Sequence, residues 1–297
     1  MGAEGSAVTG GAVADDVQWI LERERVNGGP FWSRADGSIH APAGFSTLLV
    51  LNVLGELGAT RLTHPLIADA AEFVSGYQCD DGAFRYTPGG SKLACIAGQA
   101  LAGLGRLGAA GGERAEAGFR WLLNSQWGDG GWRCPMVRLG ASTQADASNP
   151  GATLFVLDAF RFRRNIPADE AALRSGVDSL LRHWQTRVPL GPCRFGIGSR
   201  FLAVEYPFWR YNLFYYVYVL AHYPQARVDT RFAEAVRRLS SHVNAAGEMV
   251  VNAPPRAWQG RSFARKDTPS ELATRRWQQI QALLSQDHGR GRVLPGL

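Results

Sequence analysis

The chain has 297 residues, 45% of them apolar, and a formal net charge of +6 at pH 7. This length can bury about three quarters of the unfolded surface, in one large core or in two ordinary domains. Only Lys92 and Lys266 are lysines, so 30 of the 32 basic residues are arginines, and they are scattered along the chain. A nucleic-acid groove requires clustered basic residues, so no nucleic-acid partner is expected.

The amino-terminal segment is not expected to be a secretion signal. Residues 1–11 lack a basic start followed by an apolar run, so we expect a disordered tail there and not a signal peptide. No stretch approaches about 20 uninterrupted apolar residues, so no transmembrane segment is expected. We therefore expect a cytoplasmic protein whose four cysteines, which lack CxxC spacing, are reduced.

Strand signals are scarce, and the apolar spacing predicts helices throughout. Outer helices are expected at 13–25, 65–78, 113–126, 168–185 and 229–243. Inner helices are expected from the apolar stretches 44–57, 94–107, 152–162 and 213–220. Proline is favoured in the first helical turn, and five prolines stand ahead of the inner helices: Pro42, Pro88, Pro150, Pro207 and Pro269. The prediction is an all-α chain of about ten helices in five hairpins.

One sequence motif occurs twice in the chain. Residues 118–132 contain an aromatic-aliphatic pair, then Gln126, then Gly130-Gly131-Trp132, and a looser version runs from Phe73 through Gln78 to Phe84. Each glutamine closes a helix, and its amide can bond the free carbonyls there or at the start of the next hairpin. The aromatic residue packs across the glycine turn. These residues are therefore expected to join hairpins.

This motif resembles the QW repeat of the squalene-hopene cyclase and protein prenyltransferase superfamily. The resemblance implies an α/α toroid, a ring of five to six helical hairpins around a central apolar cavity, with one domain at 12–286 and a C-terminal tail at 287–297. Fold and function separate easily, so the resemblance alone names no reaction.

In such a ring every loop from an outer to an inner helix emerges at one end, beside the inner-helix amino termini. Their partial positive charges favour an anionic group at that cavity mouth. Catalytic residues are sought in these loops, and the candidates are Glu205, Asp146, His40, Cys193 and Cys134. Candidate substrate-binding residues are Arg200, Tyr206, Trp209, Asn212, Tyr216, Arg85, Tyr86 and Trp32.

Glu205 is the leading candidate for acid–base chemistry. At helical spacing it shares one face with Trp209, Asn212 and Tyr216, within a stretch rich in aromatic residues. A desolvated carboxyl group can act as a general acid or base, and ring faces stabilise a cationic intermediate. The alternative is that the aromatic residues fill a wide ring and that Glu205 pairs with an arginine such as Arg200.

The chain departs from the family's reaction motifs. In the stretch 200–209, which is similar to the zinc-binding turn of prenyltransferase β subunits, Ala203 and Glu205 replace the zinc-binding aspartate and cysteine. The motifs DxDD and DDxxD are absent, and Asp80-Asp81 is expected to cap a loop. No metal or cofactor is predicted, although zinc accepts the ligand types of Cys134, Cys193, His40, Asp146 and Glu205.

Two functions remain open. The first is a terpenoid-cyclase-like or prenyltransferase-like enzyme that acts on an isoprenoid or polyene by cyclisation, isomerisation or lyase chemistry. The second is a non-catalytic toroid that binds a hydrophobic ligand or another protein. An open aromatic-lined pocket favours the enzyme, and a ring plugged by side chains favours the scaffold.

Overall fold

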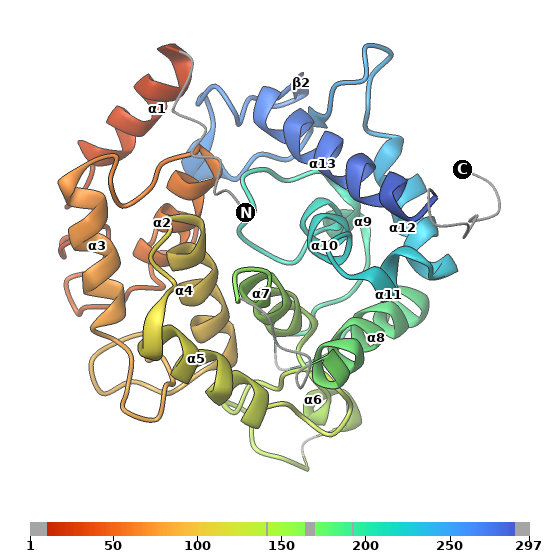
Figure 1. Ribbon diagram of the computed structural model, residues 1–297, viewed down its shortest axis with the longest axis horizontal. Helices are drawn as coiled ribbons and strands as arrows, with labels where there is room; N and C mark the ends of the chain where they lie inside the picture. The colour runs from red at the N-terminus through yellow and green to blue at the C-terminus, as the bar shows by residue number, and fades with distance from the viewer. Residues whose placement is uncertain (1–10, 141, 164–169, 192, 289–297) are drawn as a thin grey trace.

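The computed structural model describes residues 11–140, 142–163, 170–191 and 193–288 (Figure 1). Within these ranges the chain is all-α, as predicted, apart from one short antiparallel pair between β1 (Val250–Val251) and β2 (Thr268–Pro269). The tails predicted at 1–11 and 287–297 lie largely outside the described residues, and the parts inside belong to the first and last helices. No described helix is long and apolar enough to cross a membrane.

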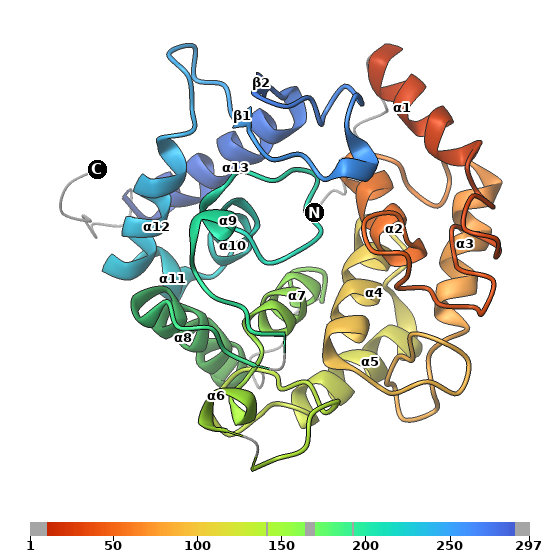
Figure 2. The same ribbon diagram turned by 180° about the vertical axis from the view of Figure 1, so that it is seen from behind.

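The helices form a ring of hairpins, seen from its two faces in Figures 1 and 2. The outer helices are α1 (Gly11–Leu21), α3 (Pro65–Ser75), α5 (Gly112–Asn124), α8 (Glu170–Thr186) and α12 (Thr230–Ser240). The inner helices are α2 (Thr47–Glu56), α4 (Ala94–Arg106), α7 (Pro150–Phe160) and α10 (Leu213–Leu220). α13 (Glu271–His288) follows α12. In Figure 1 its axis runs along the page, whereas α7 and α10 are seen nearly end-on. The short helices are α6 (Thr143–Asp146), α9 (Ser199–Leu202), α11 (Pro224–Arg227) and the 3-10 turn η2 (Arg256–Trp258).

The inner helices form the core. Every residue of α7 is buried, so its sequence shows no polar face. α4 and α7 pack closely because Gly98 has no side chain, and a Cβ at this position would lie 2.8 Å from the carbonyl of Phe155. Small residues at such a contact let two backbones approach, so the glycine sets the spacing of the central pair.

Two of the five prolines stand at or just before a helix start. Pro150 is the first residue of α7, and Pro269, in β2, precedes the start of α13 at Glu271. Pro42, Pro88 and Pro207 lie in loops, further ahead of α2, α4 and α10, which begin at Thr47, Ala94 and Leu213. A proline fixes its own backbone angle and disfavours helix in the residue before it, but it does not require a helix after it.

The glutamines join neighbouring hairpins. The Gln126 amide nitrogen donates to the carbonyl oxygen of Gly130 at 2.7 Å and to that of Ala172, in the next outer helix, at 2.7 Å. Gln78 makes the same two kinds of bond, to Gly82 at 3.1 Å and to Arg114 at 2.7 Å. Each amide thus links one hairpin to the next, in agreement with the expectation from the sequence.

Buried tryptophans complete these joints. Trp132 is fully buried, and its indole N–H donates to the carbonyl oxygen of Leu122 at 2.7 Å. Trp32 makes the equivalent bond to Ile20 at 3.0 Å in the first hairpin, where Glu24 stands in place of the glutamine. Trp32 was predicted to bind substrate, and that prediction is wrong because its ring is enclosed in the hairpin joint.

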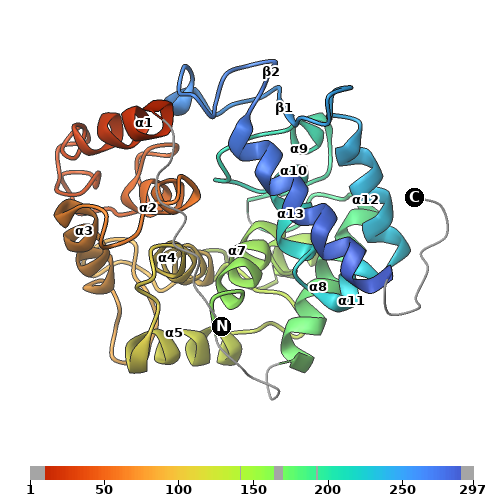
Figure 3. The same ribbon diagram turned by 45° about the horizontal axis from the view of Figure 1, so that its top comes forward.

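The ring closes between its first and last segments, which lie side by side in Figure 3. The backbone N–H of Ser262 donates to the buried carboxylate of Asp16 in α1 at 2.9 Å. Trp258 packs against Trp19 and Phe45, with ring centroids 6.3 and 4.8 Å apart. These contacts join residues more than 200 positions apart, so closure depends on the complete ring.

Replacement of Trp132 by alanine should destabilise the protein by about 3–5 kcal/mol, because it removes a buried aromatic ring and its hydrogen bond. Trp127→Ala is the control, since Trp127 lies in the same loop but is 38% exposed. Urea unfolding measures both. Equal stability of Trp132→Ala and the wild-type protein would contradict the structural role of this ring.

Candidate functional site

A pocket of about 220 Å³ lies at the amino-terminal ends of α2, α4 and α7. We call it the N-terminal pocket. Its lining residues are His40, Ala43, Gly44, Ser46, Leu49, Cys95, Gln99, Asn149, Ala152, Phe155, Cys193, Phe195, Trp209 and Arg210. Three predicted site residues therefore meet here: His40, Cys193 and Trp209. The volume equals that of roughly seven water molecules, so the pocket holds a small molecule or one end of a longer one.

His40 lines the pocket and is the imidazole among its titratable groups. Its ring retains accessible surface, and within the described residues neither ring nitrogen has a hydrogen-bond partner. Surrounding protein atoms desolvate the imidazole and lower the pKa of His40 below its ordinary value. The ring is therefore neutral at pH 7 and can accept a proton.

The pocket thiols are poor nucleophiles. Burial raises the pKa of Cys95 to about 12, with a further contribution from Cys134 and Cys193. Burial and Cys134 also raise the pKa of Cys193, against a hydrogen bond from Asn149. Thiols in this state remain protonated at neutral pH, and the thiolate is the reactive form.

Glu205 lies behind the pocket wall and is fully buried. The Arg210 guanidinium donates two hydrogen bonds to its carboxylate, and the indole N–H of Trp209 donates a third at 2.9 Å. The partner expected from the sequence was Arg200, but Arg200 is exposed on α9. Glu205 thus holds two pocket-lining side chains in place.

The helical face predicted for Glu205, Trp209, Asn212 and Tyr216 does not exist, because α10 begins only at Leu213. Asn212 is the N-cap of α10 and accepts from the N–H of Tyr215 at 3.0 Å. The Tyr216 hydroxyl donates to the carbonyl oxygen of Leu180 at 3.3 Å, away from the pocket.

The remaining predicted residues are spread around the molecule. Asp146 accepts from the backbone N–H of Gly140 at 3.0 Å and lies 3.9 Å from Arg133. Arg85 bonds the carbonyl oxygen of Gly90, and the backbone of Tyr86 accepts from Ile39 at 2.9 Å. None of these side chains lines the N-terminal pocket. Tyr206 is fully buried, and its hydroxyl donates to Glu56 at 3.1 Å on the other side of the ring.

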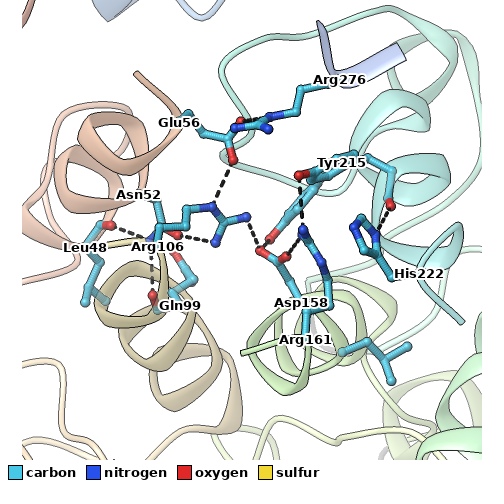
Figure 4. Close-up of polar contacts among 12 residues, drawn as sticks. Leu48, Asn52, Glu56, Gln99, Arg106, Asp158, Arg161, Tyr215, His222 and Arg276 are labelled. Atoms are coloured by element: carbon cyan, nitrogen blue, oxygen red, sulfur yellow. Dashed lines mark hydrogen bonds and ion pairs between the residues drawn. The ribbon is translucent and has the colours of Figure 1, made fainter. Parts of the chain in front are cut away.

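A buried polar network lies at the carboxyl ends of α2, α4 and α7 (Figure 4). Arg106 donates to Glu56 at 2.9 Å, to Asn52 at 2.9 Å and to Asp158 at 2.6 Å. Arg276 of α13 also donates to Glu56, at 2.6 Å. The network connects α2, α4, α7 and α13.

Both network carboxylates are ionised. Burial would raise the pKa of Glu56, but Arg276 and Arg106 outweigh burial and leave this pKa lowered. Burial likewise opposes ionisation of Asp158, yet Arg106 and Arg161 lower its pKa to about 2. The Tyr215 hydroxyl donates to Asp158 at 2.6 Å. These carboxylates hold the ring together and are not available as acids.

Sequence analysis missed several pocket residues, namely Ser46, Cys95, Gln99, Asn149 and Arg210. Ser46 and Asn149 precede inner helices, and Cys95 lies in the first turn of one, so their positions near helix starts were the available signal. Among the described residues, no group of three or more His, Cys, Asp or Glu side chains is arranged to hold a metal ion.

No family model matches the chain, and no curated protein matches it. Among solved structures, a protein from Actinoplanes has a TM-score of 0.55 at 18% identity, with coverage of 94% of this chain and 78% of that one. Type II terpene cyclase MstE from Scytonema, in its apo form, has a TM-score of 0.35 at 16% identity, with coverage of 92% and 96%. A possible member of the GH105 family from Salmonella enterica scores 0.39 at 12% identity, with coverage of 82% and 71%. At sequence identities this low, structural similarity shows only the fold. TM-scores below 0.5 support no conclusion about function.

Replacement of Arg106 by methionine should cost about 3–5 kcal/mol of stability, because two buried carboxylates then lose a shared partner. The matched control is Arg174→Met, which removes an exposed pair with Glu170 and should cost less than about 0.5 kcal/mol. Urea unfolding gives both values. A loss at Arg106 no larger than at Arg174 would show that the network does not support the ring.

Mild acid should destabilise the protein through its buried histidines. Burial lowers the pKa of His183, and burial with Arg161 lowers that of His222 to about 3. Below about pH 6.5 the unfolded state binds more protons at these rings, so stability is complete above that pH and falls with acidification. The free energy of unfolding should drop by on the order of 2 kcal/mol between pH 7 and pH 5.

This acid response has a direct control. His222→Gln should show a smaller drop over the same interval, because one titrating ring is gone. Glu56 and Asp158, whose pKa values are lowered, lose their contribution only below about pH 4 and so do not affect this window. A wild-type protein equally stable at both pH values would contradict the assignment.

Proposed function

We propose that the protein is an enzyme that performs proton-transfer chemistry on a small apolar molecule of isoprenoid or polyene type in the N-terminal pocket. The observation that carries the proposal is His40, a neutral, unpartnered imidazole with access to a pocket whose wall includes Phe155, Phe195 and Trp209. Unpartnered titratable groups in apolar pockets are typical of catalytic sites.

Isomerisation is the step that this pocket supports best. Movement of a double bond requires the removal of one proton and the return of one proton, and a single imidazole can do both. Phe155 and Trp209 line the pocket and offer apolar contact surface to the carbon chain of the substrate. An elimination, which is a lyase reaction, uses the same first transfer: the leaving group departs with the electron pair of its own bond, and the imidazolium then releases the proton to solvent.

Cyclisation by protonation of an alkene has less support. That step needs a strong carboxylic acid, but Glu205 is held by Arg210, and Glu56 and Asp158 are held by the arginines of the network. We therefore assign Glu205 a positioning role and place the transferred proton on His40. Glu205→Gln should then lower Tm, since Arg210 loses its charged partner, and should reduce turnover much less than His40→Gln does.

The second candidate function is a non-catalytic toroid that holds an apolar ligand or contacts another protein. The observation in its favour is the network around Arg106, whose buried ion pairs join α2, α4, α7 and α13 and serve the fold without any ligand.

The experiment starts with mass spectrometry of lipids that copurify with the protein. Compounds of that class, together with short isoprenoid alcohols and acids, are then incubated with the protein in D₂O, and products are analysed for new isomers and incorporated deuterium. His40→Gln should reduce turnover at least about 100-fold with an unchanged Tm. His64→Gln is the control, because His64 is exposed at the start of α3 and lies outside the pocket.

The two functions predict different outcomes. Deuterium incorporation that requires His40 supports the enzyme. Binding of an apolar ligand that is recovered unchanged, with equal affinity for wild-type protein and His40→Gln, supports the binding toroid. Turnover that persists in His40→Gln would remove the imidazole from the mechanism.

A further inference from the structure

The first turn of α2 contains polar groups that lack partners. Ser46 occupies the N-cap in extended conformation, with φ −95° and ψ 164°, but its side chain accepts no capping hydrogen bond. By contrast, Asn149 caps α7 by accepting from Ala152 at 3.1 Å. A serine at an N-cap normally accepts from the helix backbone, so its failure to do so requires an explanation.

Ser46 is also enclosed. Its residue is only 3% exposed, it lines the N-terminal pocket, and within the described residues its hydroxyl has no hydrogen-bond partner. The adjacent Thr47 is fully buried, and its hydroxyl is likewise without a partner. Buried polar groups are nearly always satisfied, and an exception calls for a water, an ion or a ligand.

The backbone of this turn adds further donors. The N–H of Leu48 is taken by the carbonyl of Ile39 at 3.0 Å, but the N–H groups of Thr47 and Leu49 have no acceptor within the described residues. Such free N–H groups carry the positive end of the helix dipole. Ser46 and Leu49 of this turn line the pocket.

The rest of the pocket is also electropositive. The amino-terminal turns of α4 and α7 contribute Cys95 and Asn149 to the lining, and α4, like α2, has no side-chain cap. Arg210 lines the wall with its charge paired to the buried Glu205, and no acidic side chain is among the described lining residues. The cysteine thiols are protonated and add no negative charge.

We propose that the α2 end of the N-terminal pocket binds an oxyanion of the substrate, a carboxylate or a phosphate, through the Ser46 hydroxyl and the free N–H groups of the first turn. The substrate is then a small amphiphile whose charged head lies at α2 and whose apolar part faces Phe155 and Trp209. The inference rests on the proposed function in taking this pocket as the substrate site, but binding can be measured without turnover.

The test is calorimetric titration with three probes that share a six-carbon chain: hexanoate, hexyl phosphate and 1-hexanol. At least one of the two anions should bind at least about tenfold more tightly than the alcohol, because hydrogen bonds to a charged group are the stronger ones. The anion that binds better identifies the head group as carboxylate or phosphate.

Ser46→Ala should weaken binding of the preferred anion about tenfold and leave that of 1-hexanol unchanged. Its Tm should stay level or rise, since the lost hydroxyl had no partner. The matched control is Ser270→Ala, a buried serine that caps α13 by accepting from Ala273 at 3.3 Å. That variant should keep its affinity and lose about 2–4 °C in Tm.

Three outcomes would overturn the inference: 1-hexanol binding as tightly as both anions, Ser46→Ala retaining full affinity for the preferred anion, or no binding of any probe. His40→Gln separates this inference from the proposed function. If anion binding persists in a protein that never turns over substrate, the anion site stands and the enzymatic proposal fails. If turnover depends on His40 but Ser46→Ala binds the anion normally, the enzymatic proposal stands and the anion site fails.

Discussion

The structure depends on the ion pairs of Arg106 with Glu56 and Asp158, because a ring of helices must fill its own axis. Apolar side chains of the inner helices fill most of it, but these three charged groups meet where α2, α4 and α7 end. A buried charge without a partner costs several kcal/mol, so the helices that carry these residues must stay in register. Arg276 brings α13 into the same network and contributes to ring closure.

The direction of the inner helices accounts for the position of the pocket. α2, α4 and α7 present their carboxyl ends to the arginines, where cations are favoured by the helix dipole. Their amino ends consequently meet at the opposite side, where the N-terminal pocket lies. The same arrangement that stabilises the arginines therefore supplies a positive, donor-rich environment for a ligand.

Within that pocket, desolvation determines which group can react. Desolvation by neighbouring atoms keeps the thiols of Cys95 and Cys193 protonated and keeps His40 neutral. Glu205 is fully buried and is paired with Arg210. The free base and the uncapped starts of α2 and α4 suit an amphiphile with a charged head and an apolar body.

The sequence by itself determined the helices and their joints. Apolar periodicity located the inner and outer helices, and the sequence motif around Gln126 predicted how hairpins connect. Both signals arise from residues close together in the chain. The candidate loops also led to His40, Cys193 and Trp209 of the pocket. The helical spacing assumed from Glu205 to Tyr216 was wrong, because the residues before Leu213 lie outside α10.

Only the tertiary structure decided which side chains meet. The partner of Glu205 proved to be Arg210, five residues along a loop, because a loop's path depends on the packing around it. The Arg106 network joins residues from separate hairpins, and the missing cap at Ser46 is visible only once its surroundings are known. Contacts between distant segments depend on how the whole ring closes, and no local pattern in the sequence records that closure.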